Sequence, residues 1–121
     1  MTDTLSAPAV DTRTRLRAIE DPAELEARLV ASAKALREDL IAAAPEAEKL
    51  THIPPHIERK LEDAGLYRMF IPREHGGLEV APSTFAKVVI EIAKGDMGMA
   101  WNFCLAANHA LMLANWFPVE I

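Results

Sequence analysis

The sequence predicts an all-α fold of about four helices, and three observations support this prediction. Half of the 121 residues are hydrophobic but only 6% are aromatic, and alanine and leucine, both good helix formers, recur throughout. Hydrophobic residues repeat at helical spacing in several segments. Signals typical of β-hairpins are missing from the sequence. A chain of this length has room for one domain with a core of moderate size.

The composition narrows the classes of function. A net charge of -5 provides no broad cationic surface, so nucleic acid is not an expected partner. Cys104 is the single cysteine, which excludes an internal disulfide and fits a reducing cytoplasm. The amino terminus lacks the basic region and hydrophobic run of a signal peptide. We expect residues 1–20 to form a flexible tail before a helical domain of residues 21–121.

The first helix is predicted to begin after residue 20. Asp21 can cap it, and Pro22 suits its first turn. One hydrophobic stripe then follows at helical spacing, made of Leu25, Leu29, Leu36 and Leu40. Because proline clashes with the preceding turn, we expect this helix to break or bend at Pro45.

The second helix is predicted to begin near Pro54 and Pro55 and to end at Gly65, where glycine permits a Schellman-type stop. Its buried side consists of Ile57, Leu61 and Ala64. Residues 66–72 are expected to be extended, and the glycine pair at 76–77 supplies the backbone freedom for a turn.

Two further helices follow. The third opens at Pro82 and stops at Gly95, and its hydrophobic positions are spaced i, i+3, i+4 and i+7: Phe85, Val88, Val89 and Ile92. Asp96 then caps a fourth helix that runs to about Trp116, before Pro118 interrupts it.

The fourth helix is long and uncharged enough to be compared with a membrane-spanning helix. Residues 97–119 contain no charged side chain, and the stretch is long enough to cross a bilayer. It carries several polar residues, however, which are costly in hydrocarbon: Asn102, Asn108, His109 and Asn115. Leu, Ile and Val are too few to offset them. A helix buried among other helices is therefore the better interpretation.

The polar residues of this helix form two neighbouring stripes. Residues seven apart return to nearly the same face, which pairs Asn102 with His109, Trp101 with Asn108, and Asn108 with Asn115. Spacing leaves two explanations open. The amides and the imidazole make hydrogen bonds between helices within the bundle, or the stripe lines a ligand pocket.

Several segments occur in an order and spacing that are specific together, although each is weak alone. They are residues 61–68, 71–78, 82–85, 90–96 and 101–109. Together they resemble the amino-terminal helical domain of the acyl-CoA dehydrogenase superfamily, closest to its branch of flavin-dependent monooxygenases of aromatic compounds. The resemblance implies an apparently truncated chain, without the β-domain and the carboxy-terminal helical bundle that the family places later.

The resemblance also implies a site. In this superfamily the corresponding helix packs toward the flavin and lines the substrate cavity. In the monooxygenase branch a tryptophan is followed eight residues later by a histidine, as Trp101 is by His109 here. His109 is then the expected catalytic residue, since imidazole exchanges protons near pH 7. Trp101, Asn102, Leu105 and Asn108 are the expected residues of the substrate and flavin pocket.

The implied enzyme is a two-component monooxygenase that uses reduced flavin and oxygen on an aromatic or similar small substrate. FMN or FAD would be its cofactor, a flavin reductase its partner, and a homotetramer its assembly. An acyl-CoA dehydrogenase, which removes hydrogen from the α and β carbons of an acyl thioester, is the first alternative. Trp101 and His109 favour the monooxygenase, because dehydrogenases usually carry smaller residues on this helix. A non-enzymatic helical module that binds a partner through the fourth helix is the second alternative.

Other candidate features carry less weight. His52 and His56 have a spacing seen in metal ligands, but prolines separate them and no third ligand is placed to complete a site, so no metal is expected. Ala81 replaces an aspartate cap that is common in the family, at a cost of about 1 kcal/mol of helix stability. The Met-Gly-Met run at residues 97–99 replaces smaller or hydroxyl residues and leaves the shape of the pocket open.

Overall fold

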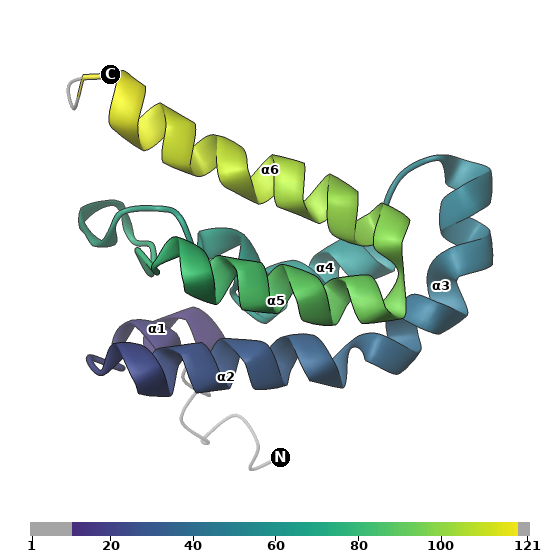
Figure 1. Cartoon of the computed structure of the whole chain (residues 1–121), viewed down its shortest axis with the longest axis horizontal. Coiled ribbons are helices and arrows are strands. Elements are labelled where there is room, and N and C mark those ends of the chain that lie inside the picture. Colours follow the sequence, from purple (N-terminus) through teal and green to yellow (C-terminus); the bar gives the residue numbers. More distant parts are fainter. Residues whose placement is uncertain (1–10, 119–121) are drawn as a thin grey trace, which may run out of the picture.

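The computed structural model describes residues 11–118, and within this range every regular element is helical (Figure 1). The elements are α1 (Thr12–Arg17), α2 (Pro22–Ala35), α3 (Arg37–Leu50), α4 (Pro55–Asp63), the 3-10 turns η2 (Leu66–Arg68) and η3 (Arg73–His75), α5 (Pro82–Gly95) and α6 (Met97–Trp116). The all-α prediction is confirmed. The described residues contain six α-helices rather than about four.

Helix α5 lies at the centre of the molecule and packs against α2, α3 and α6. In Figure 1, α2, α5 and α6 lie one above another, and α6 runs back along α5 toward the end where α2 begins. The core between these layers contains Leu29, Val88, Ile92 and Phe103, each with none of its surface exposed. Their burial fixes α6 along one side of α5.

The predicted helix starts are confirmed. The Asp21 carboxylate accepts a hydrogen bond from the Ala23 amide at 3.2 Å, and Pro22 stands at the start of α2. At α6, Asp96 Oδ1 accepts from the Met99 amide at 2.7 Å. These bonds satisfy amides that the helix itself leaves without partners. At α5, Ala81 makes no side-chain cap.

Asp96 is also the only residue between α5 and α6. At this junction the end of α5 lies close against the start of α3, because a Cβ built on Gly95 would stand only 2.7 Å from Leu40 Cβ. Glycine is therefore needed for this close approach rather than for its backbone angles. The junction is short and tightly packed.

The prediction of a tail through residue 20 missed a helix. Thr12–Arg17 forms α1, whose amino end is capped by the Asp11 carboxylate at 2.7 Å from the Arg13 amide. Its single leucine, Leu16, is 3% exposed and sits in the core. One hydrophobic residue in six gives no periodicity, so the sequence held no helical signal here. Residues 1–10 lie outside the described range.

The predicted break at Pro45 is wrong, because the chain bends at Leu36 and α3 continues through the proline. Proline removes the hydrogen bond to the carbonyl of Ile41. Ile41 is 55% exposed and Pro45 is exposed as well, so this side of α3 faces solvent and water can supply the missing hydrogen bond. The bend at Leu36 lets α3 turn across the end of α5 (Figure 1).

The predicted extended segment at residues 66–72 is also wrong. Gly65 ends α4 in the left-handed region at φ 78°, as predicted, but the chain then enters a 3-10 turn. Leu66, Met69 and Phe70 are all buried, and their spacing of three and four fits a helical turn rather than a strand. The returning segment pairs with this turn, because the Leu78 amide donates to the Arg68 carbonyl at 2.9 Å.

The predicted turn at the glycine pair is confirmed, and each glycine has its own reason. Gly76 adopts φ 86°, a left-handed conformation that side chains disfavour. At Gly77, an added Cβ would stand 1.9 Å from the Ile71 carbonyl oxygen. This turn therefore needs glycine once for conformation and once for space.

A carboxylate joins α3 to α5 and gives the fold a pH dependence. Glu91 accepts hydrogen bonds from Lys94 Nζ and Arg37 Nη2, both at 2.9 Å. The bond from Lys94, followed by that from Arg37, lowers the pKa of Glu91 below its ordinary value of 4.5 against the opposing effect of burial. A lowered folded pKa means that the stabilisation is present above the ordinary pKa and is lost as the pH falls through the folded pKa.

We therefore expect Glu91→Gln to lower the melting temperature at pH 7, and this difference to shrink as the pH falls below about 4. Thermal unfolding of both proteins between pH 7 and pH 3 measures it. Glu20→Gln, at an exposed position, is the control and should change little. A difference that stays constant over this pH range would contradict the assignment.

Candidate functional site

Helix α6 buries one face and leaves the opposite face open to solvent. The buried face consists of Met99, Ala100, Phe103 and Ala107. The Phe103 ring lies 5.1 Å from the Tyr67 ring and 6.2 Å from the Phe85 ring, measured between centroids. These contacts attach the inner face of α6 to the core, so the backbone that carries the outer-face side chains is held in place.

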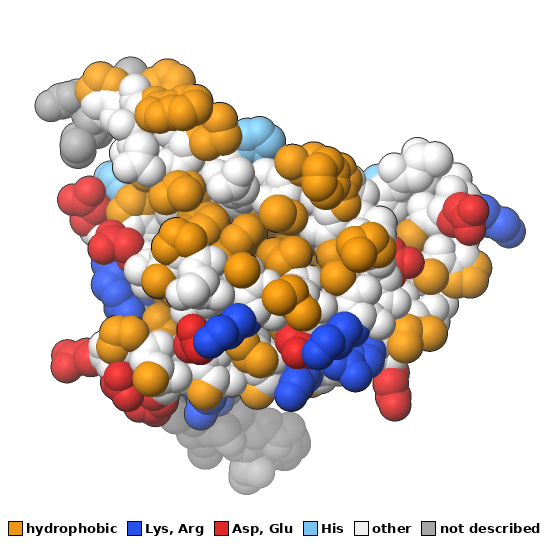
Figure 2. Space-filling view, viewed as in Figure 1, with side chains coloured by type: hydrophobic (Ala, Val, Ile, Leu, Met, Phe, Trp, Pro, Cys, Tyr) orange, Lys and Arg blue, Asp and Glu red, His pale blue; other side chains and the backbone are white. Residues whose placement is uncertain are grey.

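The outer face is strongly hydrophobic. Trp101 is 65% exposed and Trp116 is 71% exposed. Most of the large exposed hydrophobic residues within residues 11–118 lie on α6 or directly after it (Figure 2): Met97, Trp101, Leu105, Leu113, Trp116 and Phe117. An exposed hydrophobic surface of this kind marks a place where a ligand or another protein surface packs. Across residues 11–118, no helix combines the length and hydrophobicity that crossing a bilayer requires.

The structure brings most of the predicted site residues to this outer face. Trp101, Leu105 and His109 are four apart, so they follow one another along the helix, and all three are exposed. Asn102 is exposed beside them, whereas Asn108 is partly buried at the edge. The described residues do not enclose this face. Within them, the predicted pocket residues form an open surface and not an enclosed cavity.

The interpretation of the polar stripes as helix-to-helix hydrogen bonds is wrong for Asn102 and His109, because both side chains are exposed. Asn115, which also belongs to the stripes, donates from Nδ2 to the Leu111 carbonyl of its own helix at 2.7 Å. The side chains of Asn102 and His109 therefore face outward from the helix bundle.

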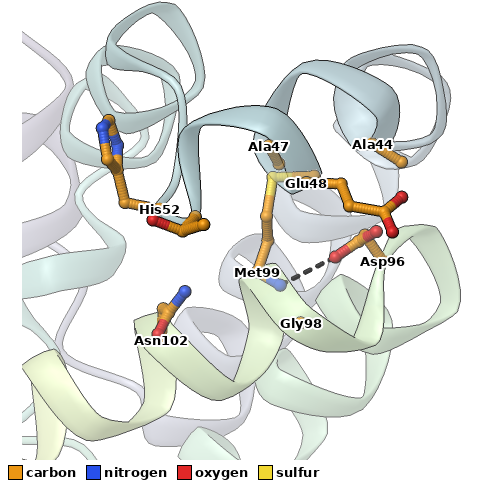
Figure 3. A pocket seen from close by; sticks show the side chains of 9 residues that line it. Ala44, Ala47, Glu48, His52, Asp96, Gly98, Met99 and Asn102 are labelled. Atoms are coloured by element: carbon orange, nitrogen blue, oxygen red, sulfur yellow. Dashed lines mark hydrogen bonds between the residues drawn. The ribbon is translucent and has the colours of Figure 1, made fainter.

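A pocket adjoins the start of this face. It has a volume of about 370 Å³ and lies between the end of α3 and the first turns of α6 (Figure 3). Its lining comprises Ala44, Ala47, Glu48, Thr51, His52, Asp96, Gly98, Met99 and Asn102. Asn102 is the predicted site residue that belongs to both the pocket and the open face.

The pocket is electronegative. The carboxylates of Glu48 and Asp96 lie side by side at one end, and His52 lies at the other (Figure 3). Its lining contains neither lysine nor arginine. The carboxyl end of α3, which terminates at the left-handed Thr51, adds the negative end of a helix dipole.

No pattern in the sequence predicts this pocket. Glu48 and Asp96 are far apart in the chain, and only the bend at Leu36 brings the end of α3 over the start of α6 (Figure 1). His52 lines the pocket, whereas His56, four residues further on, lies with its Nδ1 3.8 Å from Glu46 Oε2. No group of three possible metal ligands occurs among the residues described.

Tyr67 lies beneath α6 and supports it. Its hydroxyl donates to Glu58 Oε1 at 3.3 Å. Burial, and then the negative charge of Glu58, raise the pKa of Tyr67 far above its ordinary value. The phenol therefore keeps its proton at neutral pH, which makes Tyr67 part of the packing and not a proton acceptor.

Residues 23–116 match the family described as acyl-CoA dehydrogenase, N-terminal domain. The match covers most of the chain, and the chain belongs to this family. Both the all-α architecture and the resemblance seen in the sequence are confirmed by this match.

Curated relatives lie in the monooxygenase branch. The chain is 35% identical over 71 residues to the oxygenase component of p-hydroxyphenylacetate 3-hydroxylase from Acinetobacter baumannii, a region covering 59% of this chain and 17% of that protein. It is 31% identical over 80 residues to the pigment production hydroxylase of Rhodococcus erythropolis, covering 66% and 20%. It is 30% identical over 69 residues to indole-3-acetate monooxygenase from Pseudomonas putida, covering 54% and 17%.

The chain thus spans about a fifth of the length of these relatives, or less. No solved structure matches it significantly.

Proposed function

We propose that this chain is the amino-terminal domain of a longer flavin-dependent monooxygenase, and that the outer face of α6 is one wall of its active site. The observation that carries the proposal is this uncharged face, on which Trp101, Leu105 and His109 stand exposed in one row. The names of the three relatives, a hydroxylase oxygenase component, a hydroxylase and a monooxygenase, support it.

The residues of α6 suit a flat aromatic group. Trp101 and Leu105 offer an apolar surface for a ring, and Asn102 and His109 offer hydrogen bonds at its edge. Residues 97–116 contain no lysine or arginine, so α6 does not suit the phosphate of FMN or FAD. The ring system of the flavin therefore fits this wall, while its phosphate needs cations from elsewhere in the complete protein.

Reduced flavin, when bound, supplies the electrons that activate oxygen. The role of this chain is to orient the substrate and to transfer a proton to or from it. Trp101 and Leu105 exclude water from one side of the substrate, and His109 accepts or donates a proton at the substrate hydroxyl. The packing of Phe103 against Tyr67 and Phe85 keeps these groups in position.

The same proposal includes partners. The term "oxygenase component" in the name of one relative supports a separate flavin reductase that supplies FMN or FAD in reduced form. A homotetramer and a cytoplasmic location belong to the proposal as well.

The test is oxygen incorporation by the full-length protein. We expect it to oxygenate a phenol or an indole, for example 4-hydroxyphenylacetate or indole-3-acetate, when supplied with reduced FMN or FAD. Under ¹⁸O₂ the product should carry one labelled oxygen atom, detected by mass spectrometry. Conversion of acyl thioesters to enoyl thioesters without labelled oxygen would instead establish an acyl-CoA dehydrogenase. Neither reaction, together with tight binding of a protein through α6, would establish a helical interaction module.

A further inference from the structure

The outer face of α6 carries a seam of side chains that runs along the whole helix. Its members follow one another at intervals of four, four, three, four and four residues, which keeps them on one side of an α-helix: Met97, Trp101, Leu105, Asn108, Met112 and Trp116. We call this set the outer seam. It spans about 28 Å of helix, and its two end residues are 72% and 71% exposed. The described residues therefore leave both ends of the seam open to solvent.

The size of this surface is close to what one side of a stable protein interface needs. Trp101 and Trp116 are 65% and 71% exposed, and a tryptophan has roughly 250 Å² of surface to bury. Four further large hydrophobic side chains on α6 or directly after it are between 42% and 72% exposed: Met97, Leu105, Leu113 and Phe117. Together the six offer roughly 700 Å², whereas a standard interface takes roughly 800 Å² from each partner.

The distribution of charge favours a second copy of the chain as the partner. Residues 97–117 contain no Asp, Glu, Lys or Arg, although the whole chain has a net charge of -5. Two copies can therefore meet along α6 without bringing like charges into contact, and a strongly charged partner would find no group to pair with. The repulsion that remains between two negative chains acts at a distance and is screened by salt.

The order of the side chains in the outer seam suits an antiparallel pairing with itself. A two-fold axis midway between residues 106 and 107 places Met97 opposite Trp116 of the second copy. The same axis places Trp101 opposite Met112. Each tryptophan thus meets a methionine, and the contact of a thioether with an aromatic ring is favourable.

The centre of the outer seam can fix the register. The axis places Leu105 opposite Asn108 of the second copy, and the two copies of Asn108 are separated by about 4.5 Å along the helix direction. Asn108 is half-buried, and pairing would surround its amide with apolar side chains. A polar residue of this kind in an apolar seam specifies register, because a shifted pairing leaves the amide without a partner.

We propose that the 121-residue chain pairs with a second copy of itself through the outer seam, as a two-fold, antiparallel dimer of α6 helices. A surface that complements itself about a two-fold axis gives closed dimers rather than open chains. This pairing does not require the function proposed above, and the two occupants exclude each other on one helix. Either the second copy or the flavin and its substrate cover Trp101.

Sedimentation equilibrium of the 121-residue chain measures the pairing. We expect twice the chain mass of 13.3 kDa at about 100 μM, and dissociation on dilution toward about 1 μM, as for an interface of moderate affinity. Added salt should strengthen the dimer, because it screens the net negative charge. Both tryptophans of the chain belong to the outer seam, so their fluorescence emission should move to shorter wavelength as the dimer forms.

Leu105→Glu places a carboxylate beside the axis in each copy, and we expect it to raise the dissociation constant about tenfold or more. Ile41→Glu makes the same change at a hydrophobic side chain on α3 that is 55% exposed. It is the matched control and should keep the dimer. Circular dichroism of both variants verifies that they remain helical.

Cysteine cross-linking measures the orientation of the two helices. In a Cys104→Ser background, a mixture of Met97→Cys and Trp116→Cys chains should rapidly form a disulfide between the two variants under mild oxidation. Met97→Cys chains alone should not, because antiparallel pairing separates their two thiols by about 28 Å along the helix direction.

Several results would overturn the pairing: a helical chain that stays monomeric at the highest concentration, larger aggregates without a dimer, or equal weakening by Leu105→Glu and Ile41→Glu. A monomer would leave the outer seam to flavin, substrate or another part of a longer protein. Rapid cross-linking of Met97→Cys chains alone would overturn the antiparallel register. The monooxygenase is tested separately, by oxygen incorporation in the full-length protein, so it can stand or fall without the dimer.

Discussion

Replacing His109 with alanine in the full-length enzyme should cut turnover about 100-fold or more, the usual scale for the loss of a general acid or base. The reason is the position of the imidazole on the open face of α6, in line with Trp101 and Leu105. Because His109 is exposed, its removal should change the free energy of unfolding by no more than about 0.5 kcal/mol. Single-turnover product formation and thermal melting on the same samples measure both effects.

His75 supplies a matched control, since it is an exposed histidine in a surface turn, 3.8 Å from Glu74. His75→Ala should leave turnover and stability unchanged. If His109→Ala lowered the melting temperature while turnover per folded molecule survived, His109 would be a structural residue, and its assignment to the active site would fail.

Phe103→Ala should be the most damaging single substitution on α6, with a loss of about 3 to 5 kcal/mol in the free energy of unfolding. Phe103 is fully buried and packs against Tyr67 and Phe85. Its removal leaves a cavity at the point where α6 is attached to the core. A loss of this size is a large share of the stability of a small domain, which is typically about 5 to 15 kcal/mol.

Trp101→Ala is the control for Phe103→Ala, because it removes a large aromatic side chain from the same helix at a position that is 65% exposed. It should cost about 0.5 kcal/mol or less. Urea denaturation of the 121-residue chain, followed by circular dichroism, compares the two. Equal losses for the two variants would show that α6 is not attached through its Phe103 face.

Local chemistry allowed several features to be predicted from the sequence. The caps at Asp21 and Asp96 and the stop at Gly65 depend on the residue and its immediate neighbours, and the structure contains all three. The bend at Leu36 was not predictable in this way, because it depends on how α3 fits against Gly95 at the far end of α5. Proline at position 45 gave a stronger local signal, but solvent exposure made it harmless.

The candidate site likewise has one part that follows from a single helix and one part that depends on tertiary contacts. The family resemblance selected Trp101, Leu105 and His109, and because they share one helix the structure places them in one exposed row. The pocket of Glu48 and Asp96 joins two segments that only the tertiary fold brings together, and no spacing rule describes it. Which side chains of α6 face the core depends on where α5 packs against it. Helical spacing alone therefore does not distinguish an exposed Asn102 from one that makes hydrogen bonds between helices.

Because Asp96 is the only residue between α5 and α6, a rigid-body tilt of α6 would have its pivot at the amino-terminal end of the helix. The helix is 20 residues long, which corresponds to about 30 Å. A tilt of about 10° at the pivot would move Trp101 by about 1 Å, His109 by about 3 Å and Trp116 by about 5 Å, from the helical rise alone. A rearrangement between Gly95 and Leu40 that tilted α6 would therefore displace the outer face of the helix most at its far end, and least at the end beside the acidic pocket.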